Sequence, residues 1–350
     1  MDMSAHPTTG RPVARPAAIA RWLFLVAALI LLMVLVGGVT RLTESGLSIT
    51  EWKPVTGALP PIGDAAWAAE FERYKHSSQY ELMNQGMTLA AFQHIFFWEY
   101  VHRLLGRIIG LVYALPMLWF FARRAVPRGH GVRLVILLLL GGAQGAVGWL
   151  MVKSGLTDRV NVEPAMLAAH LGMALILMGA VLWTACDMRL LTRNPVARPV
   201  RPTLWGVATV ILLFVQLLLG AITAGLRAGY VSSTWPLMND HIVPEGIVWW
   251  GSFWRTITSD QYLVHFIHRW WAWGVALAIF VLARQLQRVE ARGMAHALLT
   301  LVAVQILLGI ATVVTGVALP IAVTHQVAGA VLLGVTVAGA HRLGAERVRG

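Results

Sequence analysis

The sequence has little charge and almost no cysteine. Only 13% of its 350 residues are charged while 57% are hydrophobic, and the mean hydropathy is +0.67. This composition excludes an ordinary soluble domain, which needs more polar side chains to cover its surface. The single cysteine, Cys186, excludes an intrachain disulfide. We therefore expect an integral membrane protein whose fold depends on helix packing and bound cofactors, with the lipid bilayer around it.

Acidic residues are also scarce. The chain has 16 Asp and Glu against 28 Lys and Arg, which gives a net charge of +12. The basic residues lie in short tracts between apolar runs, a pattern typical of membrane topology signals. The excess positive charge therefore predicts no nucleic-acid partner.

Eight apolar stretches are long enough to cross about 30 Å of hydrocarbon at about 1.5 Å per residue. Five of them carry almost no charge: 22–39, 134–152, 164–186, 203–226 and 294–318. Three more have histidines or charges in their first third: 95–122, 262–283 and 319–340. These stretches predict an all-α membrane protein with eight transmembrane helices.

The arginines predict the orientation of these helices. Most basic residues fall in alternate connecting segments: the N-terminal tail, 123–133, 189–201, 284–292 and 342–349. The positive-inside rule places these segments, and both termini with them, in the cytoplasm. No small-residue cleavage site follows the first apolar run, so we expect an uncleaved anchor.

The chain also contains an internal repeat. Its matched elements are Gly37-Gly38-Val39-Thr40 before Gly46 with Gly220-Ala221-Ile222-Thr223 before Gly229, Val101-His102-Arg103 with Ile267-His268-Arg269, 144–148 with 305–309, and His170 with His325. Each half has an even number of crossings, so both halves enter the membrane in the same direction. We predict two pseudo-twofold-related four-helix bundles, at 22–186 and 203–340, with a cytoplasmic linker at 187–202 and cytoplasmic tails at 1–21 and 341–350.

Two long loops lie on the opposite side, at 42–94 and 227–261. The first contains a possible surface helix near Asp64 to Lys75. Long loops often have a function, but a passive cap over the bundle is an open alternative.

Four histidines are matched between the halves: His102, His170, His268 and His325. Each is expected about two turns or less from the outer end of its helix, so all four should lie at similar depth. A pair of neutral imidazoles on adjacent helices can ligate a haem iron inside a bundle. Zinc or copper usually needs three or four ligands at one point. The histidines therefore predict two haem sites, although a single membrane histidine is as often a packed hydrogen-bonding group.

Charged residues accompany these histidines. Arg103 and Arg269 directly follow a predicted ligand, and each could bind a haem propionate or extend to the membrane interface. Glu99 lies three residues before His102 and shares a helix face with it, whereas His265 stands at the matching place. Glu99 could be a plain interface residue, but this difference indicates that the halves have different tasks.

The remaining histidines carry weaker signals. We interpret them as solvated or interfacial and assign them no ligand role: His6, His76, His94, His130, His241, His296 and His341.

Several motifs in the chain resemble the haem A synthase family of proteobacteria and mitochondria, nearly from end to end. They are Gly37-Gly38-Val39-Thr40-Arg41-Leu42-Thr43 with Ser45-Gly46-Leu47-Ser48, Glu51-Trp52-Lys53-Pro54 with Gly57 and Pro60-Pro61, Phe97-Trp98-Glu99-Tyr100-Val101-His102-Arg103-Leu104-Leu105-Gly106-Arg107, Thr234-Trp235-Pro236-Leu237-Met238-Asn239, and 265–269. The resemblance implies oxidation of a methyl group of haem O to a formyl group through an alcohol, for terminal haem-copper oxidases.

The resemblance also implies roles for individual residues. His268 and His325, with Arg269, would hold a haem b cofactor in the C-terminal half. The substrate haem O would lie between His102 and His170 beside Arg103, and Glu99 would be catalytic. Some bacterial relatives have a cysteine pair in the first outer loop; this loop has none, so a thiol relay there is excluded.

Partners and location follow from the same resemblance. We expect haem O as substrate, an unidentified electron acceptor, haem O synthase as a candidate partner, and a bacterial inner membrane rather than the mitochondrial one. Two other functions stay open: a di-haem b-type cytochrome that exchanges electrons with quinone, and a histidine-based proton-coupled transporter.

Overall fold

A computed structural model describes residues 14–53, 56–156 and 159–347 of the chain. The described residues are mostly helical and form no β-strand. Eight helices are long and apolar enough to cross a membrane, which confirms the predicted all-α membrane class. They are α1 (Pro16–Leu42), α4 (Leu89–Ala122), α5 (Gly131–Leu156), α6 (Pro164–Arg193), α7 (Leu204–Gly225), α9 (Gln261–Arg288), α10 (Arg292–Val314) and α11 (Leu319–Arg347).

Several helices extend beyond their predicted ends. Helices α1, α6 and α11 continue into segments expected to be tails or linker. Helix α4 begins at Leu89, because the Thr88 hydroxyl accepts a hydrogen bond from the Ala91 backbone N–H and caps the first turn. The tail residues 1–13 and 348–350, and Pro54 of one family motif, lie outside the described residues.

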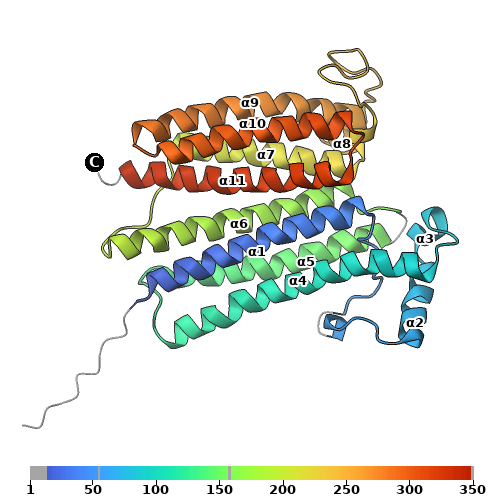
Figure 1. Ribbon diagram of the computed structural model, residues 1–350, viewed down its shortest axis with the longest axis horizontal. Coiled ribbons are helices and arrows are strands. Elements are labelled where there is room, and N and C mark those ends of the chain that lie inside the picture. The colour runs from blue at the N-terminus through green and yellow to red at the C-terminus, as the bar shows by residue number, and fades with distance from the viewer. Residues whose placement is uncertain (1–13, 54–55, 157–158, 348–350) are drawn as a thin grey trace, which may run out of the picture.

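The helices of each half lie together. In Figure 1, α7, α9, α10 and α11 form one group, and α1, α4, α5 and α6 form the other. Between the groups, α6 packs on α7 and α11, and α1 packs on α11. The seam between the halves is therefore built from these four helices. A pseudo-twofold relation of two bundles stays a prediction.

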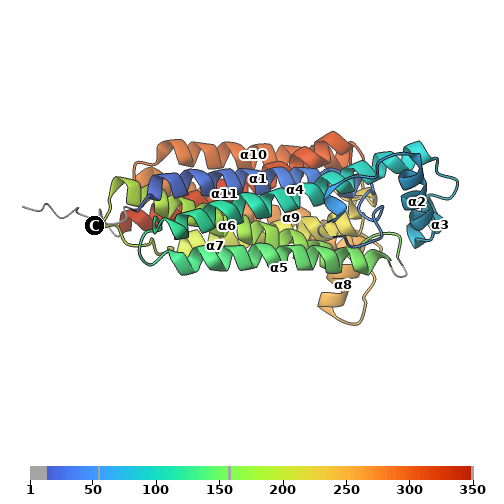
Figure 2. The ribbon, with the colours of Figure 1, turned by 90° about the horizontal axis from the view of Figure 1, so that it is seen from below.

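The chain begins and ends its described part at one end of the molecule, and the long loops lie at the other (Figures 1 and 2). Near the first end, the buried Asp187 carboxylate on α6 accepts hydrogen bonds from Arg133 (2.5 Å) and from the Val200 backbone (3.2 Å), and its partner on α11 is His341 (2.9 Å). His341 and His130 are buried, so neither is solvated; the interfacial position that the sequence predicts for both stays a prediction. The Asp187 contact ties the two halves together, because α6 and α11 belong to different halves.

The first outer loop carries two short helices, α2 (Asp64–Lys75) and α3 (Ser78–Met83). The predicted surface helix is thereby confirmed. Phe71 and Tyr74 of α2 stack on Phe92 of α4, with ring centres 5.0 and 5.2 Å apart. This aromatic cluster anchors the loop to the extended outer end of α4, and Figure 2 shows α2 and α3 at that end of the molecule. The second loop carries α8 (Phe253–Ser259).

Candidate functional site

The structure brings the four matched histidines together as two pairs. The ring centres of His102 and His170 are 6.5 Å apart, and those of His268 and His325 are also 6.5 Å apart. Two imidazoles that bind one metal ion from opposite sides, each at about 2.1 Å, would have ring centres roughly 6.4 Å apart. Both pairs are therefore spaced to ligate an iron ion between them.

Three of these histidines lie where the sequence placed them, and one does not. His170, His268 and His325 are the seventh, eighth and seventh residues of their helices, about two turns in. His102 is the fourteenth residue of α4. The expectation of two turns or less is wrong for His102, because α4 extends outward to meet the loop helices.

All four histidines line one large cavity. Its volume is about 1210 Å³, and Gly37, Gln216 and Gln305 are among its other lining residues. This volume exceeds the ~300–1,000 Å³ of sites for one drug-sized ligand. The cavity crosses the seam between the halves, so two large flat ligands would share one apolar chamber.

A glycine on a neighbouring helix lies against each ring. A Cβ at Gly148 would lie 2.7 Å from His170, and one at Gly220 would lie 3.0 Å from His268. Gly37 and Gly309 stand in the same way beside His102 (3.3 Å) and His325 (3.1 Å). Since any side chain at these positions would press on an imidazole, the glycines leave room for rings that face the cavity.

Glutamine side chains support two of the rings. The Gln144 amide nitrogen lies 3.2 Å from Nδ1 of His170 and donates to the His170 carbonyl (3.0 Å). Gln216 contacts His268 in the same way, at 3.2 and 2.9 Å. Within the described residues, the Oε1 atom of each amide is buried without a hydrogen-bond partner.

The unpaired Oε1 atoms of Gln144 and Gln216 are suitable partners for histidines that bind haem iron. A histidine that binds iron through Nε2 carries its proton on Nδ1 and usually donates it to an outer partner. A turn of the amide about its last bond places Oε1 beside Nδ1 to accept that proton. The histidine carbonyl would not be left unpaired, because it is already an acceptor within its own helix. The residues present therefore fit haem at both pairs.

Glu99 is buried beside the first pair. Its side chain is 4% exposed, and it accepts hydrogen bonds from the Ser48 hydroxyl (2.7 Å), the Ile49 backbone N–H (2.8 Å) and Arg103 (2.6 Å). Arg103 also donates to the carbonyl of Ile49 (2.8 Å). The carboxylate thus lies at the cavity wall with its charge balanced and its position fixed by the first outer loop.

His265 occupies the matching place in the second half. Arg269 donates to Nε2 of His265 (3.0 Å) and to the carbonyl of Thr234 (2.9 Å) in the second outer loop. Arg103 and Arg269 therefore both join a cavity-lining helix to an outer loop. Their proposed contact with haem propionates stays a prediction.

The sequence-based interpretation missed the amide partners. The sequence pattern indicated Gln144 and Gln305 only as members of the internal repeat, and it predicted no role for Gln216. Their common signal is a glutamine four residues before a glycine in an apolar helix. Four residues make about one helical turn, so the amide and the small residue face the same histidine.

Comparisons with known proteins give a consistent result. The family model described as COX15-CtaA, Cytochrome oxidase assembly protein, matches residues 20–337. The chain is 55% identical to the Heme A synthase of Sphingopyxis alaskensis over 97% of this chain and 95% of the relative. It is 48% identical to the Heme A synthase of Rhizorhabdus wittichii over 99% and 100%, and 49% identical to that of Novosphingobium aromaticivorans over 99% and 100%.

The match extends over nearly the whole length of this chain and of each relative, so it includes both histidine pairs, both outer loops and all eight membrane helices. This confirms the family that the sequence motifs indicated. The chain therefore belongs to the COX15-CtaA family of cytochrome oxidase assembly proteins, with relatives named Heme A synthase.

Proposed function

We propose that this protein is a haem A synthase of a bacterial inner membrane. It oxidises one methyl group of haem O to a formyl group through an alcohol, and the product serves terminal oxidases. The observation that carries this proposal is the presence of two histidine pairs at ligand spacing in one apolar cavity. One pair suits a resident cofactor and the other suits a substrate that is itself a haem.

The two pairs have different tasks in this proposal. His268 and His325, with Arg269, hold haem b; His102 and His170, with Arg103, bind the iron of haem O. When bound, a b-type haem supplies one-electron redox chemistry. The difference between the halves supports this assignment, because a buried carboxylate lies beside the first pair and a histidine takes its place beside the second.

Glu99 is the catalytic residue of the proposal. It lies about one helical turn from His102 on the same face, and its charge can stabilise positive charge that develops at the oxidised carbon. It can also accept a proton from an attacking water. The bonds from Ser48, Ile49 and Arg103 hold the carboxylate in place for either role.

The proposed partners are haem O, an electron acceptor that takes the electrons removed from the methyl carbon, and haem O synthase as the source of substrate. Both termini face the cytoplasm in this proposal, as the basic segments predict. The division into 22–186 for substrate and 203–340 for cofactor follows from the two pairs.

Pigment analysis tests the function directly. The chain is expressed in a host supplied with haem O, and the haems are extracted and identified with and without it. We expect haem A and its alcohol precursor only when the chain is present. A permanent di-haem cytochrome would bind haem but form neither pigment, and a transporter without haem would show no haem absorption; either result would contradict the proposal.

A further inference from the structure

The glutamine that precedes the glycine beside each histidine has one exception. A Gln-x-x-x-Gly sequence occurs at Gln144 with Gly148, at Gln216 with Gly220 and at Gln305 with Gly309. Each glycine lies against one histidine of a pair. The fourth glycine, Gly37, lies against His102, but the residue one turn before it is Met33.

The three glutamines reach toward the helix that carries their histidine. Gln144 and Gln216 contact Nδ1 and the carbonyl of His170 and His268. The amide nitrogen of Gln305 lies 3.0 Å from the place of a Cβ on Gly329, one turn after His325. An amide therefore contacts the rings of His170 and His268, whereas within the described residues Nδ1 of His325 and Oε1 of Gln305 are both buried without a hydrogen-bond partner.

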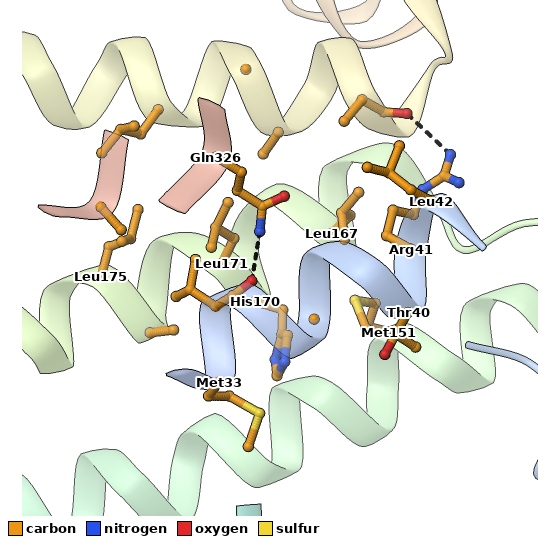
Figure 3. A pocket seen from close by; sticks show the side chains of 18 of the residues that line it. Met33, Thr40, Arg41, Leu42, Met151, Leu167, His170, Leu171, Leu175 and Gln326 are labelled. Atoms are coloured by element: carbon orange, nitrogen blue, oxygen red, sulfur yellow. Dashed lines mark hydrogen bonds between the residues drawn. The ribbon is translucent and has the colours of Figure 1, made fainter. Parts of the chain in front are cut away.

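Met33 cannot replace that amide. Its thioether has no N–H donor and is only a weak acceptor, and its three rotatable bonds make it adaptable rather than fixed. Figure 3 shows both Met33 and His170 among the side chains that line the cavity. The Met33 methyl carbon lies 3.6 Å from the place of a Cβ on Gly106, one turn after His102. Met33 therefore lies where a glutamine would reach His102.

The His102 ring is also turned differently from the other three. His170, His268 and His325 present Cε1 as the atom nearest to their glycine, with Nδ1 next. His102 presents Nε2 and Cδ2 to Gly37 (3.3 and 3.5 Å). The planes of the first pair meet at 52°, compared with 87° for the second. The ring whose glycine is preceded by a methionine is the ring with the different orientation.

We propose that Met33 makes His102 the releasable ligand of the first pair, so that this pair exchanges its haem while the second pair, which has a glutamine one turn before each of its two glycines, retains its own. The inference rests on the proposed function for the identity of the two haems. In a synthase the substrate must enter and the product must leave, whereas a cofactor must stay. One methionine in place of glutamine supplies that difference, because an outer-shell hydrogen bond strengthens and orients a histidine ligand.

Haem release from the purified full-length protein tests the proposal. Protein made in a host supplied with haem O is mixed with excess apomyoglobin, and the haems transferred over time are extracted and identified. Met33→Gln should slow release of haem O and haem A by about tenfold and leave haem b release unchanged. Gln216→Met, which gives the second half the residue of the first, should speed haem b release by about tenfold.

Two further variants separate the amide from simple packing. Met33→Leu keeps an apolar side chain of similar size, so it should release haem O and haem A at the wild-type rate. Gln144→Met should speed that release by about tenfold, and it decides the question if Met33→Gln does not fold. The low-spin absorption of the ferric protein, which reports two histidine ligands, should persist longer after mixing in Met33→Gln.

Unchanged haem release in Met33→Gln, or equal slowing by Met33→Leu, would overturn the inference. Where Met33→Gln does not fold, wild-type release from Gln144→Met would overturn it. Failure of the proposed function has a different signature, since the wild-type protein would then contain neither haem A nor its alcohol precursor. Slowing of haem b release by Met33→Gln would show that the halves are assigned the wrong way round.

Discussion

The two halves of the molecule use the same scaffold with different side chains at two positions beside the histidines. In the first half, Arg103 pairs with the carboxylate of Glu99; in the second, Arg269 pairs with the neutral ring of His265. Both arginines also bind carbonyls of an outer loop. The loop attachment is therefore common to the halves, and the carboxylate belongs to the first alone.

The second difference is the support of one ring. In the second half, Gln216 lies four residues before the glycine beside His268 and contacts that ring. In the first half, Met33 lies four residues before the glycine beside His102. A repeat can keep its backbone geometry while single residues change what each copy binds, because packing fixes the helices and the side chains decide the chemistry. Substitutions at these positions test how the two halves differ.

Removal of a ligand histidine should have the largest effect. His268→Ala should lose all of the haem b, because one remaining imidazole cannot provide both axial ligands. His102→Ala should keep haem b and lose haem O binding. Haem content per protein, measured on extracted pigments, checks both. Loss of haem b from His102→Ala with retention in His268→Ala would reverse the assignment.

The Glu99→Gln substitution should have the next largest effect. It keeps the size of the side chain and one acceptor oxygen but removes the negative charge and the second acceptor, so haem A formation should fall about 100-fold. Haem b content should not change, and it serves as the check that the protein is folded. His265→Gln is the matched control and should change haem A formation less than Glu99→Gln. Normal haem A output from Glu99→Gln would contradict the catalytic role.

An added methyl group at Gly148 should have a smaller effect. A Cβ there would lie 2.7 Å from His170, so Gly148→Ala must displace the ring and should weaken haem O retention about tenfold. Gly141→Ala on the same helix is the control, because no atom lies within 4 Å of its added carbon. Haem O bound per protein is the measurement, and equal retention by the two variants would rule out the glycine contact.

The seam between the halves should give the smallest effect. Gln326 on α11 donates to the Val34 carbonyl on α1 (2.9 Å), and a dashed line marks the bond from Gln326 in Figure 3. Leu171 follows His170 as Gln326 follows His325, so Gln326→Leu makes the halves more alike. Loss of this bond should lower the free energy of unfolding by about 1 kcal/mol without changing haem content. Thermal unfolding in detergent measures it, and a change in haem content would show that the seam also supports the sites.

Much of this description could be predicted from the sequence. Long apolar runs identified all eight membrane helices, because a helix that crosses lipid must satisfy its own backbone and needs about 20 apolar residues. The matched histidines were identified by their positions in the repeat. The true start of α4 at Leu89 was missed, since its first turns extend beyond the apolar run that was assigned to the membrane and are stabilised by the Thr88 cap and by packing on α2.

Other features needed contacts between distant residues. His341 and Asp187 are 154 positions apart, and no local pattern in the sequence connects them. Glu99 likewise meets Ser48 and Ile49 only because the first outer loop folds back on α4. Such contacts depend on loop paths, which hydropathy does not determine.

The sequence alone determined that the protein is built from apolar helices, that its halves repeat, and that two histidines of each half are matched by the repeat. The apolar helices follow from the composition and the length of the apolar runs, because a chain in lipid must satisfy its backbone polar groups within each helix. The repeat and the matched histidines follow from the order of the residues. Tertiary structure decided which residues surround those histidines. Packing placed a glycine against every ring and an amide against His170 and His268, and it placed Met33 against Gly106, one turn after His102, because contacts between helices arise only when the helices have met.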